Sequence, residues 1–433
     1  MSQYRAYPAY KDSGVEWIGQ VPEHWKVARV KRLASLRNER RNDVSTDTIY
    51  IGLEDVEAGS GQYKPTNGSS RQSEDSTVGI FYEGDVLYGK LRPYLRKAII
   101  SEMAGCCSTE FLVLRAEKTE PRWLQEWLLT PDVTHQIESG CEGAKMPRAD
   151  WGHIGSIEVV YPDQPEQAKI LTSLDRETAR IDALIEKKTR FIELLKEKRQ
   201  ALITHAVTKG LDRNAKMKDS GIEWIGQVPE EWLNRKVFHA FQAIGSGTTP
   251  PAKEHEWYQG GTIPWITTSE LRENTVVKTK KCVTSDAMQK FSALKIFPAG
   301  SLAIAMYGAT IGRLGFLGIP ATTNQACCVL SGERDLNIQF LYYWLMAFRA
   351  DIVAFFSEGG GQPNINQEVI ASLRVPSPAS DEQATIVATL DRETARIDAL
   401  ISKAEQSITL LKERRAAFIT AAVTGQIDLR GKQ

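Results

Sequence analysis

The twelve residues LDRETARIDALI occur at 174–185 and again, unchanged, at 390–401. The repetition extends further, because DSGVEWIGQVPEHW at 12–25 returns as DSGIEWIGQVPEEW at 219–232. The step from position 174 to position 390, which we call the repeat offset, is far longer than the unit of a solenoid. The sequence therefore predicts a duplicated chain, in which each half has a linker, a variable region and a helical arm.

Each arm has the seven-residue spacing of a coiled coil. The first arm has one apolar series, interrupted by Lys188, made of Leu174, Ile181, Leu195 and Leu202. The companion series is expected three residues further on, at Leu184 and Phe191. The second arm repeats both series, with Leu390, Ile397, Ala404, Leu411 and Phe418, and with Leu400 as companion. The alternative is that both helices only cover globular cores.

Most of the shared segment DRETAR is polar, so a buried stripe alone does not require it to be identical in both arms. A surface that docks the same partner twice would require it. Recent duplication explains the identity equally simply, although the regions between the arms have diverged greatly. Both explanations remain open at the level of sequence.

The variable regions, about 26–162 and 233–378, share a skeleton but not a surface. CCSTEFLVLRA in the first corresponds to NQACCVLSGE in the second, and WLQEWLLT corresponds to FLYYWLMA. Short β-rich runs such as GDVLYG, TIPWITT and SLAIAMYG alternate with Gly and Pro turns, and a short helix is expected at PRWLQEWLLT or IQFLYYWLMAFRADIVAFF. The pattern predicts two copies of one α/β domain with different loops, as recognition of two different targets requires.

Cationic and hydrogen-bonding side chains gather in these loops, and Tyr88 interleaves with the cations of YGKLRPYLRK. Such groups suit phosphate neutralisation, base-edge contacts and stacking on bases. The candidate DNA-binding residues are Lys90, Arg92, Tyr94, Arg96, Lys97, Lys145, Arg148, Thr248, Thr249, Tyr307, Thr310, Arg313, Gln362, Asn364 and Asn366. Ordinary solvated loops are the alternative, since 54 Lys+Arg balance 54 Asp+Glu over the chain.

No catalytic motif is recognisable in the sequence. GDVLYGKL at 84–91 nearly matches a phosphate-binding loop, but Leu91 stands where Ser or Thr must bind magnesium, so we interpret the segment as a β-turn. The six histidines fall in no metal-ligand spacing. The six cysteines include two adjacent pairs and are expected to be reduced, mostly buried thiols. These observations favour a binding subunit without a metal site of its own.

The composition, 42% hydrophobic and 25% charged, is ordinary for a globular protein. No run of about 18 apolar residues suggests a membrane span. The N-terminal segment also lacks the basic and apolar regions of a signal peptide, so a cytoplasmic location is expected.

These motifs, in this order and twice over, resemble the specificity subunit of Type I restriction-modification enzymes. The resemblance extends over nearly the whole chain and includes LRPYLRKA, GTTPPAKEHEWYQGGTIPWITTSEL, YGATIGRLG, GQPNINQEVIASLRVPSP and PEQAKILTSLDRETARIDALI. It implies two target-recognition domains that each bind one half of an asymmetric, bipartite DNA site. It also implies two helical regions that pair antiparallel, set the spacer and dock two methyltransferase subunits.

The family further implies that the cofactors lie in partner chains and none in this chain. S-adenosylmethionine would belong to the methyltransferase subunits, and ATP and magnesium to restriction subunits, where these are present. The partner-binding candidates on the arms are Arg176, Glu177, Arg180, Asp182, Arg392, Glu393, Arg396 and Asp398. The expected chain is therefore a non-catalytic subunit that binds double-stranded DNA. A coiled-coil adaptor without DNA contact is the alternative, and a phosphate-loop enzyme is disfavoured by Leu91.

The expected fold is α/β (α+β), with two globular target-recognition domains separated by two long antiparallel coiled-coil helices and related by a pseudo-two-fold repeat. The expected order along the chain is an N-terminal segment, a first target-recognition domain, a central helical region, a linker that repeats the N-terminal segment, a second target-recognition domain and a C-terminal helical region. Their bounds are 1–25, 26–162, 163–210, 211–232, 233–378 and 379–433.

Overall fold

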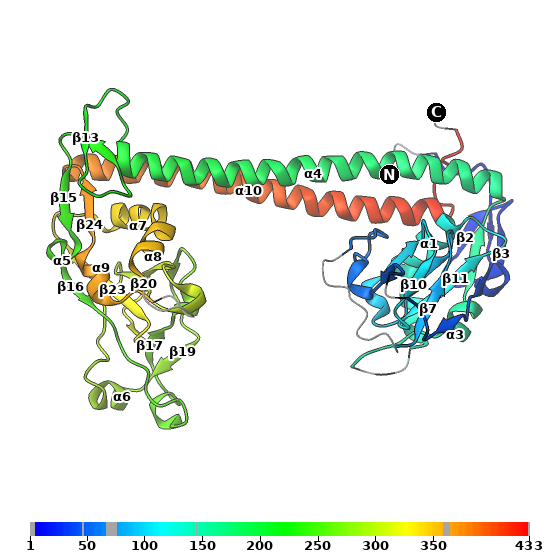
Figure 1. Ribbon diagram of the computed structural model, residues 1–433, viewed down its shortest axis with the longest axis horizontal. Coiled ribbons are helices and arrows are strands. Elements are labelled where there is room, and N and C mark those ends of the chain that lie inside the picture. The colour runs from blue at the N-terminus through cyan, green and yellow to red at the C-terminus, as the bar shows by residue number, and fades with distance from the viewer. Residues whose placement is uncertain are drawn as a thin grey trace. The chain divides into compact units, whose positions relative to one another are not determined.

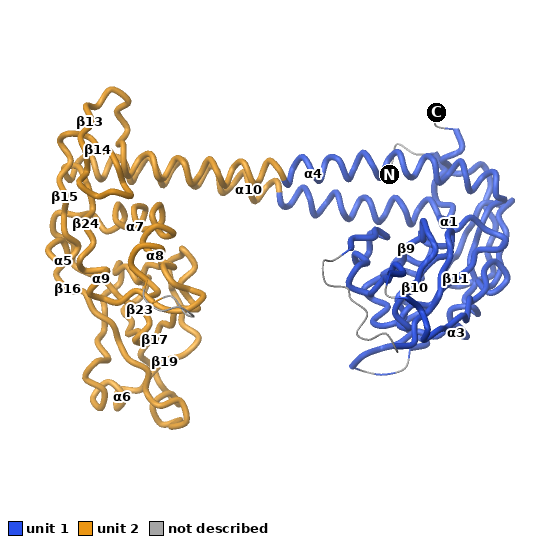
Figure 2. The backbone as a smooth tube through the Cα atoms, in the orientation of Figure 1, with its two compact units in different colours: residues 1–189, 405–433 blue, residues 190–404 orange. Residues whose placement is uncertain are grey.

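The computed structural model describes residues 5–45, 47–65, 76–141, 143, 145–357 and 364–431. It has two compact units, residues 1–189 with 405–433 and residues 190–404 (Figure 2). Two long helices, α4 (Gln164–Lys209) and α10 (Ser380–Val423), each contribute a segment to both units (Figure 1). The predicted mixed α/β architecture with two long helices is confirmed.

Unit 1 contains a variable region built on two sheets, one antiparallel and one mixed. Their strand orders are β4–β11–β8–β9 and β5–β7–β10–β6, with β6 parallel to β10. The bounds are β4 Ala34–Leu36, β5 Arg40–Arg41, β6 Tyr50–Ile51, β7 Val78–Phe81, β8 Val86–Gly89, β9 Ala98–Ile100, β10 Gly105–Cys107 and β11 Phe111–Ala116. Helices α1 (Pro121–Leu129), α2 (Pro131–Ser139) and α3 (Trp151–Ser156) follow, and the first two supply Leu128 and Ile137 to the core.

Unit 2 repeats this plan with sheets β16–β23–β20–β21–β18 and β19–β17–β22. The bounds are β16 Phe241–Gly245, β17 Ile263–Ile266, β18 Asn274–Val276, β19 Lys281–Val283, β20 Leu302–Ala305, β21 Leu314–Leu317, β22 Thr322–Thr323 and β23 Cys327–Glu333. The helices are α5 Val237–Ala240, α6 Ser285–Lys290, α7 Ile338–Ala347, α8 Arg349–Phe356 and α9 Gln367–Ser372. The apolar run predicted as one helix is therefore two, α7 and α8, which meet at Phe348.

Each variable region begins and ends on one antiparallel pair of strands. In unit 1, β3 (Lys26–Arg29) pairs with β12 (Glu158–Tyr161), and in unit 2, β15 (Leu233–Lys236) pairs with β24 (Arg374–Ser377). The repeated linkers form the hairpins β1 (Tyr10–Asp12)–β2 (Gln20–Pro22) and β13 (Met217–Asp219)–β14 (Gln227–Pro229). The chain thus enters and leaves each variable region at adjacent backbone positions, next to the start of a long helix.

Within each unit the two helix segments run antiparallel. Unit 1 packs Ile170 and Leu174 of α4 against the end of α10, and unit 2 packs Ile203 and Val207 against Ile386 and its neighbours at the start of α10. Arg415 Nε donates to Asp182 at 3.0 and 3.2 Å in unit 1. Arg199 donates to Asp398 at 2.9 and 3.3 Å in unit 2. The two ion pairs are equivalent, because the repeat offset relates Asp182 to Asp398 and Arg199 to Arg415. Pairs this exposed contribute at most about 1 kcal/mol each, so they specify register more than stability.

Most of the predicted main apolar series is buried, with Leu202 and Leu411 half-buried, but the predicted companion series is wrong. Leu174 is 0% exposed and Ile181 6%, whereas Leu184, Phe191 and Leu400 are 42%, 46% and 39% exposed. The buried companion positions lie four residues after the main series, for example at Thr178 and Ile192. Apolar residues occupy both candidate series, so periodicity alone does not identify which one faces the other helix.

Glu166-Gln167 near the start of α4 recur as Glu382-Gln383 near the start of α10, and the glutamate of each pair contacts the tryptophan of the repeated linker. The Trp25 indole donates to Glu166 Oε1 at 3.2 Å, and Trp232 donates to Glu382 Oε1 at 3.4 Å. Gln383 is fully buried, accepts from the Asn337 N–H at 2.7 Å and donates to two backbone carbonyls. In unit 1, Gln167 accepts from the Thr119 hydroxyl and the Glu120 N–H, both at 3.0 Å, and donates to the Pro162 carbonyl at 3.0 Å.

Gln383→Ala is expected to lower the free energy of unfolding of unit 2 by about 3 kcal/mol, because it removes the three hydrogen bonds that this fully buried side chain makes with backbone groups. Calorimetry of the full chain should show this effect as a lower temperature of the unfolding transition. Gln289→Ala, at an exposed position on α6, is the matched control and should leave the transition unchanged. Equal behaviour of the two variants would contradict the role assigned to Gln383.

Candidate nucleic-acid interface

In unit 1 three loops meet at the end of β8. We call residues 90–97, 108–110 and 145–149 the first loop cluster. The Lys90 N–H donates to the Glu110 carbonyl at 2.9 Å, and the Ala149 N–H donates to the Lys90 carbonyl at 2.9 Å. Leu91 and Arg148 form an antiparallel bridge. Backbone hydrogen bonds therefore bring together cationic residues that are far apart in the sequence.

Unit 2 builds the same three-loop arrangement at the end of β20, from residues 306–313, 324–326 and 364–366, the second loop cluster. The Met306 N–H donates to the Ala326 carbonyl at 2.8 Å, and the Ile365 N–H donates to the Met306 carbonyl at 3.0 Å. Tyr307 and Asn364 form the bridge. Each of these positions follows its equivalent in unit 1 by the repeat offset, so the two clusters share one backbone scaffold.

The side chains on this scaffold differ strongly between the clusters. Arg148 is paired with Glu110, with Nε to Oε2 at 3.2 Å and Nη2 to Oε1 at 3.0 Å, and its side chain stays 55% exposed. The first cluster also presents Lys90, Arg92 and Lys145, and Tyr94 is 49% exposed. Arginine and lysine suit phosphates and guanine, and an exposed aromatic ring suits stacking on a base.

Arg92 and Arg96 flank the single turn η3 (Pro93–Leu95) in left-handed conformations, with φ of 54° and 49°. Such a conformation costs a non-glycine residue of the order of 1 kcal/mol or more and persists only where the surroundings hold it. The Arg92 N–H donates to the Pro147 carbonyl at 2.9 Å, which fixes the turn to the third loop of the cluster. The backbone of the first cluster is thus set in a defined shape.

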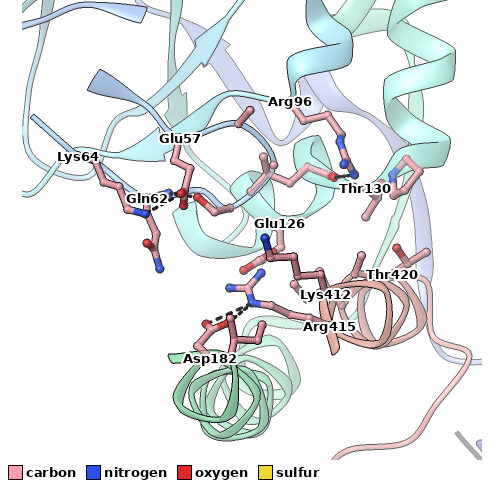
Figure 3. A pocket seen from close by; sticks show the side chains of 18 of the residues that line it. Glu57, Gln62, Lys64, Arg96, Glu126, Thr130, Asp182, Lys412, Arg415 and Thr420 are labelled. Carbon is pink, nitrogen blue, oxygen red and sulfur yellow. Dashed lines mark hydrogen bonds and ion pairs between the residues drawn. The ribbon is translucent and has the colours of Figure 1, made fainter. Parts of the chain in front are cut away.

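Two predicted cations of the first region are engaged elsewhere. The Lys97 ammonium donates to the Leu53 carbonyl at 2.6 Å. Arg96 lines a cavity of about 700 Å³ beside α1 and the arm segments of unit 1, where its Nη1 lies 3.5 Å from the Leu129 carbonyl (Figure 3). Lys412 and Arg415 line the same cavity. Arg96 therefore points toward the arm segments.

Tyr88 was expected to interleave with the cations, and this expectation is wrong. It is 0% exposed in the core of unit 1, because β8 is covered on both faces. Burial raises the pKa of Tyr88 far above its ordinary value, and no described residue accepts from its hydroxyl. The interpretation of residues 84–91 as a β-turn is also wrong for most of the segment. Residues 86–89 form strand β8, and all four are buried.

The second cluster is mostly neutral. Tyr307 and Asn364 are exposed, and Thr310 donates to the Tyr307 carbonyl at 3.2 Å. Thr249 donates to Gln325 Oε1 at 2.5 Å, which attaches the loop containing Thr248 to this cluster. Arg313, at the end of the first loop, is partly buried. Gln362, the remaining candidate of this set, lies outside the described residues.

Asn366 serves a local structural purpose. Its side-chain oxygen accepts from the Val369 N–H at 2.8 Å and caps α9, as Asp150 caps α3 in unit 1. Glu110 and Gln325 were missed by sequence reasoning. Aligning STE at 108–110 with NQA at 324–326 would have located them, because these are polar residues directly before buried strands.

The partner-binding candidates on the arms separate into two groups. Asp182 and Asp398 pair with the opposite helix segment of their own unit. Arg176, Arg180 and Leu184 lie four residues apart and share one face of α4, which we call the arm face. Its repeat equivalents on α10 are Arg392, Arg396 and Leu400, and the neighbouring residues Glu177 and Glu393 are half-buried in both copies.

Among the described residues, no helix combines the length and apolar character that crossing a membrane requires, and no His, Cys, Asp or Glu residues form a group of three or more suited to a metal ion. The described cysteines are all free thiols, and burial raises the pKa of Cys107 to about 12.

Residues 229–410 match the family model for the Type I restriction modification DNA specificity domain. The chain is 25% identical over 247 residues to the EcoR124I/EcoR124II specificity subunit of Escherichia coli, which covers 54% of this chain and about half, 55%, of that relative. It is 23% identical over 439 residues to the putative MjaX specificity subunit of Methanocaldococcus jannaschii, covering 95% of this chain and 96% of the relative.

Two solved structures share the fold at 18% identity. One is a chain from a study of complex assembly and conformational transition of the type I R-M system, with a TM-score of 0.74 over 95% of this chain and 99% of the other. The second is the HsdS subunit from Thermoanaerobacter tengcongensis, with a TM-score of 0.56 over 94% of this chain and 98% of the other.

Proposed function

Because the chain belongs to the family of Type I restriction-modification specificity subunits, we propose that it selects the DNA sequence on which a modification complex acts. Each target-recognition domain binds one half of a bipartite site through its loop cluster. The chain itself is non-catalytic. Its partner methyltransferase subunits bind S-adenosylmethionine, and restriction subunits, where present, use ATP and magnesium.

The main support is the pair of loop clusters, which have the same backbone hydrogen bonds and unlike side chains. A shared scaffold places both sets of side chains in the same way relative to a duplex. Different donors and acceptors then select different bases. The half-sites should therefore differ, and the whole site should be asymmetric.

The arms are proposed to set the spacer between the half-sites and to dock two methyltransferase subunits. The arm face supports two equivalent docking sites, because Leu184 and Leu400 are exposed to nearly the same extent and have the same arginines beside them. An exposed leucine flanked by arginines suits a partner surface with an apolar centre and acidic surroundings.

A coiled-coil adaptor without DNA contact remains the second candidate, and the arm face by itself would favour it. Gel-shift titration of genomic fragments with the assembled complex separates the two. DNA recognition predicts that a subset of fragments binds at least a thousandfold more tightly than the rest. Equal, weak binding of all fragments by a complex that assembles normally would leave the adaptor as the function.

A further inference from the structure

Arg148 and Asn364 occupy the same position in the two loop clusters. They are separated by the repeat offset in sequence, and each forms the antiparallel bridge to the first loop of its cluster. The backbone N–H of the next residue donates to the first loop at equivalent positions: Ala149 donates to the Lys90 carbonyl, and Ile365 donates to the Met306 carbonyl. The two side chains are therefore alternatives at one structural position.

The geometry of Arg148 leaves a recognition edge available. Glu110 accepts from Nε and Nη2, which uses the side edge of the planar guanidinium. The second Nη2 hydrogen and one Nη1 hydrogen are not needed for this pair, and these two parallel donors form the end edge of the group. This end edge matches the O6 and N7 acceptors of guanine in the major groove. The Glu110 pair also fixes the plane of the guanidinium before DNA arrives, which reduces the entropy lost on binding.

Unit 2 changes both members of this pair together. Ala326 stands at the position of Glu110, and Asn364 stands at the position of Arg148. A neutral amide needs no carboxylate beside it, and the exposed Asn364 offers one donor group and one acceptor. That combination matches N7 and N6 of adenine in the major groove. The paired change is chemically consistent with a change of target base.

We propose that Arg148 recognises a guanine in the half-site bound by unit 1, and that Asn364 recognises an adenine at the corresponding place in the half-site bound by unit 2. The proposal rests on the proposed function and adds the base-specifying residues to it. A phosphate contact by Arg148 is the competing role, and it would strengthen binding to every sequence alike.

The test begins with the modified motif of the wild-type complex, determined by single-molecule sequencing. Duplexes carrying each of the four bases at every position of both half-sites are then titrated with complexes of the wild type, R148N, and the double variant E110A/R148N. The double variant gives the first cluster the pair found in the second. R115N is the matched control, since Arg115 is exposed at the far end of β11 from the first loop cluster.

R148N should reduce the preference for guanine at one position of one half-site by on the order of tenfold or more, and E110A/R148N should shift that preference toward adenine. N364R should change one position of the other half-site only. R115N should bind like the wild type. A wild-type complex without any sequence preference would refute the proposed function itself.

If the wild type is selective and R148N keeps the same preferences, the assignment of Arg148 is wrong while the proposed function stands. Uniformly weaker binding of R148N to every duplex would make Arg148 a phosphate contact, which also overturns the assignment. R148K distinguishes these roles further, because lysine keeps the charge but lacks the planar fork. Phosphate contact predicts that R148K rescues binding, whereas guanine recognition predicts that selectivity stays reduced.

Discussion

Glutamate at both Leu184 and Leu400 is expected to abolish methylation at every site of the complex. Burying a leucine contributes roughly 2 kcal/mol, and burying a carboxylate in its place costs several kcal/mol in desolvation, which pairing with the neighbouring arginine offsets only in part. Each substitution should therefore weaken one docking site at least about a hundredfold. Both leucines are exposed, so the fold of the chain should be unaffected.

Light scattering of the purified chain mixed with its modification subunit measures this directly. The wild type should bind two copies, each single variant one copy, and L184E/L400E none. A179E/A395E is the matched control, because these alanines are repeat equivalents, are exposed, and do not belong to the arm face. Two bound copies on L184E/L400E would show that the methyltransferase docks elsewhere.

The sequence was sufficient to predict the duplicated plan of the chain, because that plan depends on repetition and periodicity. Identical segments beginning at 174 and 390 indicate two copies, and a main apolar series such as Leu174 and Ile181 requires a helix with one buried stripe. The runs GDVLYG, TIPWITT and SLAIAMYG contain β8, β17 and β20. These features are local, and local patterns are what a sequence displays directly.

The errors concern contacts between distant segments. Leu184 and Ile185 are both apolar, and only the position of the opposing helix decides that Leu184 is exposed while Ile185 is half-buried. Tyr88 stands among cationic residues in the sequence, as a loop residue would, but it belongs to strand β8 and is buried. Glu110 and Arg148 are 38 residues apart, so their ion pair is not visible until the fold brings the two loops together.

Exchange of residues 26–162 for the same region of another family member should replace one half-site and leave the other intact. The boundaries follow the fold, since the chain enters at β3 and leaves at β12 on paired strands. The inserted region must keep a tryptophan at the position of Trp123, because the ring centroids of Trp123 and Trp25 lie 5.7 Å apart in the core. It must also keep a backbone N–H at position 120, because this group donates a hydrogen bond to Gln167. The reciprocal exchange of residues 233–378 is the matched control and should replace the other half-site.

The most direct measurement is single-molecule sequencing of methylated adenine in cells that carry the exchanged chain with its modification partner. If each target-recognition domain recognises its own half-site, the new motif keeps one original half and gains one new half. A motif in which both halves change, or in which neither changes while methylation persists, would contradict independent recognition by the two domains.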